Sequence, residues 1–119
     1  MKILVVDDDL SIARLYKEEL EEEGYTVVMA ANGTEAMERF EQENPDLVTL
    51  DIQLPDTDGI KLLRQMKEKR PRMPVIMSTA FDYRDDFSVW ASEAYIVKTS
   101  DLTELKATIR KLIGQEEWD

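Results

Sequence analysis

The sequence predicts an α/β domain in which a parallel sheet of five strands is covered by helices on both faces. Three observations support this prediction. Short apolar runs alternate along the whole chain with longer segments of helical periodicity. The short runs are continuously apolar, which is typical of strands that are buried on both faces. Turn residues separate the elements, and right-handed crossovers between parallel strands then produce a doubly wound sandwich.

The first half of the chain is predicted to hold three strands and two helices. The strands are expected over 2–6, 25–29 and 47–50, and the helices over 10–23 and 33–43. Asp9 is the predicted N-cap of the first helix and Gly24 its C′ residue, since short polar residues begin helices and glycine often ends them. The apolar face of this helix is predicted to consist of Ile12, Leu15, Tyr16 and Leu20.

The second half continues the alternation. Helices are expected over 59–69 and 83–92, strands over 75–78 and 95–97, and a last helix from Asp101 to Gly114. Asp101 and Glu104 have the spacing of a capping box. The stripe of the last helix is predicted to be Leu102, Leu105, Ile109, Leu112 and Ile113. Phe87 and Trp90 are predicted to be core residues of the 83–92 helix, the alternative being an exposed partner surface.

Length and composition limit the class of protein. The 119 residues are predicted to form one domain, residues 1–119. No apolar run approaches the ~20 residues that cross a bilayer, and the first residues lack a signal-peptide pattern, so we expect a cytoplasmic protein with no membrane contact. The absence of cysteine and histidine excludes disulfides, thiolate metal sites and phosphohistidine on this chain. A net charge of -11 without a basic cluster argues against direct nucleic-acid binding.

Polar side chains follow four of the predicted strands. Asp7, Asp8 and Asp9 come after the first strand and Asp51 after the third, whereas the later strands are followed by Ser78, Thr79 and Ala80 and by Lys98. Parallel strands end at the same edge of the sheet, which is where doubly wound folds bind ligands. A single aspartate there is more often a turn residue or cap, Thr79 alone could be a cap, and Lys98 alone could be solvated. Their joint placement favours a site.

This group of side chains predicts phosphoryl transfer with a metal ion. Close carboxylates repel one another and call for a cation, and oxygen ligands without histidine or cysteine favour Mg²⁺ before Ca²⁺. A metal and an ammonium group neutralise phosphoryl oxygens while one carboxylate attacks in line. Asp51 stands alone after a central strand and is the better nucleophile. Asp7 and Asp8 are the better metal ligands.

The chain resembles the receiver domains of response regulators over essentially all of its 119 residues. Four segments carry the resemblance: VVDDD at 5–9, LDIQLPDTDG at 50–59, STA at 78–80 and YIVK at 95–98. The resemblance implies the flavodoxin-like strand order 2-1-3-4-5. It also implies a phosphoacceptor signalling domain of a two-component or phosphorelay system. A histidine kinase or histidine phosphotransfer protein would supply the phosphoryl group from a phosphohistidine, and phosphorylation would switch the binding of an output protein of unknown identity.

The same resemblance implies a role for each matching residue. Asp51 resembles the phosphoacceptor. Asp8 and Asp51 would ligate Mg²⁺ together with the backbone carbonyl of Gln53, while Asp7 would act through metal-bound water. The residues expected to touch the phosphoryl group or to report it are Thr79, the Ala80 amide, Lys98 and the switch aromatic Tyr95.

The chain departs from the family pattern at several positions. Thr99 stands where the family usually has proline, so a trans bond after Lys98 is expected, because a cis bond without proline costs ~3 kcal/mol. Asp56 stands where glycine is frequent and Gln53 where an apolar residue is common. Gln53 and Phe81 would flank the phosphoryl group and affect the access of water to it.

The resemblance implies a regulator that catalyses only its own phosphorylation and dephosphorylation. A Mg²⁺-dependent phosphatase with an aspartyl-phosphate intermediate is the enzyme alternative, but it would need a carboxylate at position 53 and a covering cap. An FMN carrier would need a glycine- and hydroxyl-rich loop after the first strand, where three aspartates stand. A degenerate receiver is the third alternative. A weak homodimer is also expected, through the face of the 83–92 helix, the fifth strand and the last helix.

Overall fold

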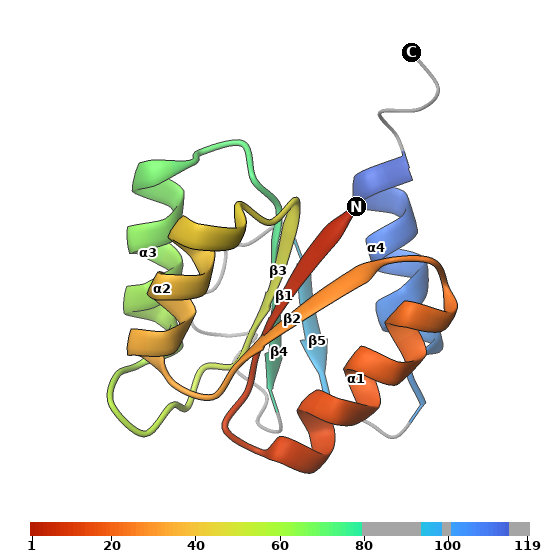
Figure 1. Cartoon of the computed structure of the whole chain (residues 1–119), viewed down its shortest axis with the longest axis horizontal. Helices are drawn as coiled ribbons and strands as arrows, with labels where there is room; N and C mark the ends of the chain where they lie inside the picture. Colours follow the sequence, from red (N-terminus) through yellow and green to blue (C-terminus); the bar gives the residue numbers. More distant parts are fainter. Residues whose placement is uncertain (80–93, 99–100, 115–119) are drawn as a thin grey trace.

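A computed structural model describes residues 1–79, 94–98 and 101–114 of the chain. Its centre is a five-stranded sheet in the order β2-β1-β3-β4-β5, in which all neighbouring strands are parallel (Figure 1). The strands are β1 (Lys2–Val6), β2 (Thr26–Ala30), β3 (Leu47–Leu50), β4 (Val75–Thr79) and β5 (Ala94–Val97). The strand order is the one expected from the sequence.

The described part of the chain contains four helices, which cover both faces of the sheet. They are α1 (Leu10–Glu22), α2 (Gly33–Glu43), α3 (Gly59–Lys69) and α4 (Thr103–Gly114). Figure 1 shows α2 and α3 on one face of the sheet and α1 and α4 on the other. The helix expected over 83–92, with Phe87 and Trp90, lies outside the described residues. None of the described helices is long and apolar enough to span a bilayer.

The core consists of two apolar clusters, one on each face of the sheet. Alternate residues of β1 divide between them: Leu4 and Val6 pack toward α2 and α3, and Ile3 and Val5 toward α1 and α4. All four side chains are buried. The continuous apolar strands predicted from the sequence are therefore explained by burial on both faces.

The ends of α1 agree with the prediction. Oδ1 of Asp9 accepts hydrogen bonds from the backbone N–H groups of Ser11 (3.0 Å) and Ile12 (3.3 Å), which makes Asp9 the N-cap. Gly24 has a φ of 97°, a left-handed conformation that costs a side-chain-bearing residue more than glycine. Its N–H donates to the carbonyl of Glu21, and the N–H of Tyr25 donates to Leu20, as in a Schellman motif.

Two details of the helices differ from the prediction. Leu15 was expected in the core but is 38% exposed, because α1 buries the face of Ala13, Tyr16 and Leu20. The last helix begins at Thr103 rather than Asp101, whose carboxylate accepts hydrogen bonds from the N–H and Oγ1 of Thr103. Asp101 thus precedes the helix.

Candidate functional site

Three aspartates lie together at the carboxyl edge of the sheet. Asp7 and Asp8 follow β1, and Asp51 follows β3. One carboxylate oxygen from each lies within 4.8 Å of the others. Asp7 and Asp51 are buried, whereas Asp8 is exposed. The carboxylates that the sequence assigned to a metal site are therefore close enough to share one ion.

Backbone hydrogen bonds that continue the strand pairing hold the two buried aspartates in place. The N–H of Asp7 donates to the carbonyl of Ala30 (3.0 Å), and the N–H of Asp51 donates to Val6 (3.1 Å). Both bonds extend a strand pairing by one residue beyond its apolar part. The two carboxylates consequently leave the sheet at the same edge and side by side.

Lys98, which follows β5, reaches the same two carboxylates. Its Nζ is 3.0 Å from Oδ2 of Asp51 and also forms an ion pair with Oδ2 of Asp7. Burial opposes the charge of Lys98, but the contacts with Asp7 and Asp51 outweigh it and raise the pKa of the ammonium group. Lys98 therefore stays protonated and compensates part of the acidic charge.

Lys98 compensates only part of the negative charge of the acidic cluster. Burial is the main cause that raises the pKa of Asp7, against the lowering effect of its hydrogen bonds with Lys98 and the Asp9 N–H. In the part of the chain that the structure describes, the Lys98 ammonium group contacts two of the three carboxylates, and all three carboxylates are hard oxygen donors. This donor set fits a small divalent cation such as Mg²⁺. Asp7, Asp8 and Asp51 could hold such an ion.

The loop between Asp51 and Gly59 is folded back on the end of β3. The N–H of Gly59 donates to Ile52 (2.6 Å), and Gln53 forms a β-bridge with Asp58. A Cβ on Gly59 would lie 2.0 Å from the carbonyl oxygen of Asp51, so only glycine allows this approach. The N–H of Gln53 is 3.3 Å from Oδ1 of Asp51. The closed loop keeps Gln53 beside the acidic cluster.

The other predicted site residues are placed only in part. Thr79 ends β4 opposite Val97, at the same edge as the aspartates, and Tyr95 lies in β5 opposite Met77. The side chains of Thr79 and Tyr95 lie outside the described part of the structure. Ala80, Phe81 and Thr99 also lie outside it, so the bond after Lys98 stays a prediction.

Ser78, the residue before Thr79 in β4, belongs to the core. Its hydroxyl is 2.7 Å from the hydroxyl of Tyr16, and both side chains are buried. Burial is the main cause that raises the pKa of Tyr16. The sequence pointed to Tyr16 only as an apolar-face residue and could not pair it with Ser78, 62 residues away. Sequence reasoning also missed the contacts of Asp56, whose only signal was its replacement of a frequent glycine.

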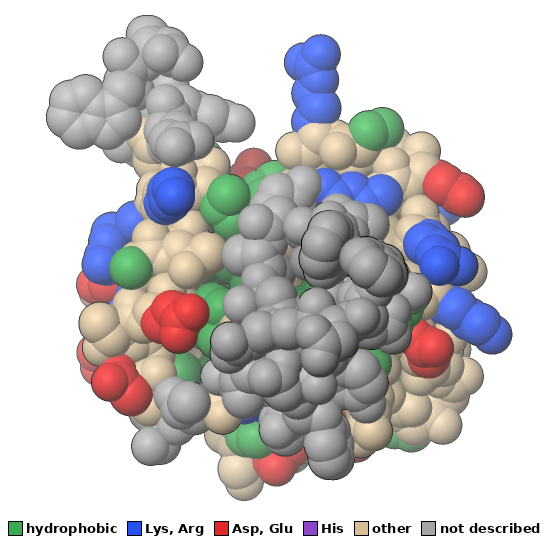
Figure 2. Space-filling model, turned by 180° about the vertical axis from the view of Figure 1, so that it is seen from behind, with side chains coloured by type: hydrophobic (Ala, Val, Ile, Leu, Met, Phe, Trp, Pro, Cys, Tyr) green, Lys and Arg blue, Asp and Glu red, His purple; other side chains and the backbone are tan. Residues whose placement is uncertain are grey.

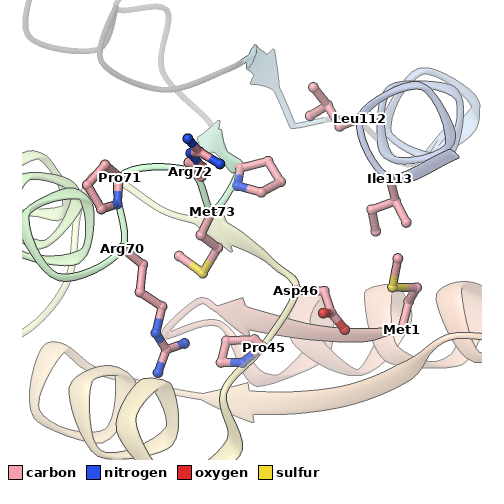
Figure 3. A pocket seen from close by; sticks show the side chains of 10 residues that line it. Met1, Pro45, Asp46, Arg70, Pro71, Arg72, Met73, Leu112 and Ile113 are labelled. Carbon is pink, nitrogen blue, oxygen red and sulfur yellow. The ribbon is translucent and has the colours of Figure 1, made fainter. Parts of the chain in front are cut away.

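A pocket of about 500 Å³ lies at the opposite, amino edge of the sheet (Figure 3). Met1, Asp46, Arg70 and Leu112 are among its lining residues and come from four separate segments. These segments precede strands or end helices, whereas the aspartates follow strands. The pocket and the acidic cluster are therefore separate features.

Charged side chains of both signs mix on the surface. Figure 2 shows Lys and Arg beside Asp and Glu on the flank that carries α3. Lys69 of α3 pairs with Glu41 of α2, and Lys106 of α4 is 3.4 Å from Glu19 of α1. Exposed pairs such as Lys69–Glu41 contribute little to stability. The closely packed, buried charges of the described residues are those around Asp51.

A doubly wound sheet in this order, with acidic residues and a lysine at its carboxyl edge, defines a class of α/β domain that binds ligands at that edge. The family model of the response regulator receiver domain matches residues 3–110. The chain belongs to this family. Receiver domains of two-component response regulators are phosphorylated on an aspartate by a histidine kinase.

Some curated relatives are about twice as long as this chain, and at least one has about the same length. The alkaline phosphatase synthesis transcriptional regulatory protein PhoP of Bacillus subtilis is 36% identical over 119 residues, which cover 98% of this chain and 50% of that protein. The chain spans about half the length of the first curated relatives it matches. Sporulation initiation phosphotransferase F of the same organism is 35% identical over 115 residues, which cover 94% of this chain and 93% of that protein.

A solved relative is the response regulator TrrA of Thermotoga maritima. Its structure in complex with Mg²⁺-BeF matches with a TM-score of 0.90 and 43% identity, over 94% of this chain and 98% of that one. TrrA has also been solved in complex with the histidine kinase ThkA, with a TM-score of 0.88 to this chain over 94% of it and 97% of the TrrA chain.

Proposed function

We propose that the chain is a phosphoacceptor domain in which Asp51 takes a phosphoryl group from a phosphohistidine, with Mg²⁺ as the cofactor. The observation that carries this proposal is the contact set of Asp51. Its carboxylate lies at the end of the central strand, 3.0 Å from Nζ of Lys98 and close to the carboxylates of Asp7 and Asp8. Asp8, Asp51 and the Gln53 carbonyl would be the ligands of Mg²⁺. The histidine would belong to a histidine kinase or a histidine phosphotransfer protein.

The hydrogen bonds favour Asp51 over Asp7 as the nucleophile. Both oxygens of Asp7 are firmly engaged, Oδ1 by the Asp9 N–H at 2.9 Å and Oδ2 by Lys98. The bond from the Gln53 N–H to Oδ1 of Asp51 is 3.3 Å, which is long for an N–H donor. This oxygen of Asp51 is the one most readily freed to attack phosphorus.

The transfer exchanges one bond to phosphorus for another. An oxygen of Asp51 bonds to phosphorus while the phosphorus–nitrogen bond of the phosphohistidine breaks, and the electron pair of that bond returns to the imidazole. A bound Mg²⁺ would neutralise phosphoryl oxygens. Lys98 would turn from the carboxylate to the phosphoryl group, and Thr79 with the Ala80 amide would bind the remaining oxygens.

We also propose that hydrolysis of this phosphoryl group is the only other reaction of the site. The carboxamide of Gln53 cannot supply the general acid that a phosphatase with an external substrate needs two residues after its nucleophile. Output would then come from a changed surface, with Thr79 and Tyr95 as the switch. The output protein and a weak homodimer would use the face of residues 83–92, β5 and α4.

The exposed face of α1 is the proposed contact for the phosphoryl donor. Leu10 is 51% exposed and Leu15 is 38% exposed, and both lie on a helix that begins beside Asp8. Leu10 follows Asp9 directly and Leu15 lies in the second turn, so a partner that reaches Asp51 could contact both. TrrA, solved with its histidine kinase, supports a donor of that class.

Phosphorylation of the purified protein tests the proposal. Incubation with acetyl phosphate and Mg²⁺, followed by intact mass spectrometry, should add a single phosphoryl group. Asp51→Asn should remove this addition, while Asp46→Asn, at the opposite edge, should not. Undiminished phosphorylation of Asp51→Asn would disprove the assignment.

A further inference from the structure

Asp56 joins two elements that flank the acidic cluster. Its Oδ1 accepts a hydrogen bond from the N–H of Gly33 (2.7 Å), and its Oδ2 accepts from the N–H (3.0 Å) and Oγ1 (2.9 Å) of Thr34. Gly33 and Thr34 form the first turn of α2, whereas Asp56 lies in the loop from Asp51 to Gly59. The carboxylate therefore caps α2 from a distant part of the chain.

The helix also has a cap of its own. Oδ1 of Asn32 accepts a hydrogen bond from the N–H of Glu35 (2.8 Å), and Oε1 of Glu35 accepts from the N–H of Ala31 (3.2 Å). The first N–H groups of a helix lack partners within it, and Asp56 satisfies those of Gly33 and Thr34. The Gly33 N–H is also the first cause that lowers the pKa of Asp56, which stays ionised at neutral pH. Asn32 thus serves the helix alone, whereas Asp56 ties the loop to the helix.

The loop and the helix also touch beside this bond. A Cβ on Gly33 would lie 2.3 Å from Cγ2 of Thr57, well inside van der Waals contact. The absence of a side chain at position 33 allows the loop to lie against the helix. Asp56 and Thr57 therefore both hold the loop against α2.

The loop is consequently held at two points. Gly59 holds its base against Asp51 and Ile52, and Asp56 holds its outer part against α2. Gln53 lies between these points and forms its β-bridge with Asp58. A loop attached at its base and at its outer part cannot carry Gln53 away from Asp51 without breaking one of the two attachments.

We propose that Asp56 is a positioning residue for the metal site, because its bond to α2 keeps the Gln53 carbonyl in place as a ligand. The inference rests on the proposed function, in which that carbonyl ligates Mg²⁺. A ligand that is already ordered costs less to bring to the metal. Partners that orient metal ligands change metal affinity when they are removed.

Mg²⁺ titration of the free protein, followed by ¹H–¹⁵N NMR and by the melting temperature, tests this role without phosphorylation. Asp56→Ala should weaken Mg²⁺ binding by about tenfold, the lower end of the range for partners of metal ligands. Asn32→Ala is the matched control, because it removes a cap from the same helix end and leaves the loop attached. It should lower the melting temperature but leave the Mg²⁺ dissociation constant unchanged.

A second pair of variants excludes the loss of negative charge as the cause. Gly33→Ala changes no charge but places a Cβ against Cγ2 of Thr57, so the Thr57 side chain, the loop or α2 must shift; through such a shift of the loop, Mg²⁺ binding should also weaken. Thr57→Ala in the Gly33→Ala background removes the atom at 2.3 Å and should restore the affinity.

The outcomes separate this inference from the proposed function. If the parent protein shows no saturable Mg²⁺ binding, the proposed metal site fails and the role of Asp56 fails with it. If the parent binds Mg²⁺ and both Asp56→Ala and Gly33→Ala bind it equally well, Asp56 is only a helix cap and the proposed function stands. Weaker binding in Asn32→Ala, equal to that in Asp56→Ala, would also overturn the positioning role.

Discussion

Charged side chains are arranged differently at the two edges of the sheet: opposite charges pair at the amino edge, and like charges lie close together at the carboxyl edge. At the amino edge, Lys2 donates from its N–H to Asp46 (2.7 Å) and from Nζ to Glu43 (3.0 Å), and the Arg70 guanidinium lies 4.2 Å from the centre of the Phe40 ring. At the carboxyl edge, the carboxylates of Asp7, Asp8 and Asp51 lie close together, and among the described residues Lys98 pairs with two of them. We expect the amino edge to gain stability from charge complementarity, and the carboxyl edge to lose stability from its close carboxylates unless the proposed cation is bound.

The largest expected change in stability comes from removing the ammonium group of Lys98 from the carboxyl edge. Lys98→Met should destabilise the metal-free protein by about 3 kcal/mol, because it leaves two buried carboxylates without their partner. Urea unfolding measures this loss. Mg²⁺ should recover part of it and should still bind, since Lys98 is not a ligand. A variant as stable as the parent without Mg²⁺ would show that the two edges do not differ as described.

The corresponding change at the amino edge should be smaller and independent of metal. Arg70→Met loses the contact with the Phe40 ring and the hydrogen bond from Nη2 to the Phe40 carbonyl, together about 1–2 kcal/mol. The Nη1 atom of Arg70 is buried and has no hydrogen-bond partner among the described residues, which limits the loss. Urea unfolding with and without Mg²⁺ should give the same difference from the parent. A difference that depends on Mg²⁺ would link the two edges.

Removing a carboxylate from the carboxyl edge should raise the stability of the metal-free protein rather than lower it. Asp8→Ala should stabilise the metal-free protein by about 0.5 kcal/mol, because it relieves repulsion at an exposed position. It should also abolish the rise in melting temperature that Mg²⁺ binding produces by mass action. Asp46→Ala, which removes an acid from the amino edge, is the control and should destabilise the protein while the Mg²⁺ response persists. A destabilised Asp8→Ala that still responds to Mg²⁺ would contradict the site.

The smallest effect concerns acid pH near the amino edge. The hydrogen bond from Lys69 is the first cause that lowers the pKa of Glu41 below its ordinary value. A carboxylate with a depressed folded-state pKa contributes stability above its unfolded pKa and loses it as pH falls through the folded value. Glu41→Gln should therefore be slightly less stable than the parent at neutral pH, and the difference should vanish in acid. Urea unfolding along a pH series, in which the gap stays constant, would show that this pair contributes nothing.

Local sequence patterns were sufficient for most of the fold. Branched apolar runs and turn residues placed the strands within a residue or two, and Asp9 and Gly24 were correctly placed as the ends of α1. Leu15 was misplaced because periodicity shows that a helix has an apolar face but does not show where that face is centred. The start of α4 was two residues early because Asp101 can bond to the next turn without being helical.

For the site, the sequence by itself determined which residues meet. Asp7, Asp8, Asp51 and Lys98 each follow a strand, and parallel strands must end at one edge, so their convergence follows from topology alone. Only the tertiary structure decided how they share charge, with Lys98 between Asp7 and Asp51 and Ser78 turned to Tyr16. The attachment of Asp56 to Gly33 and Thr34 was likewise invisible in the sequence. The physical reason is that such contacts join residues more than 20 positions apart and depend on side-chain packing, which no local pattern encodes.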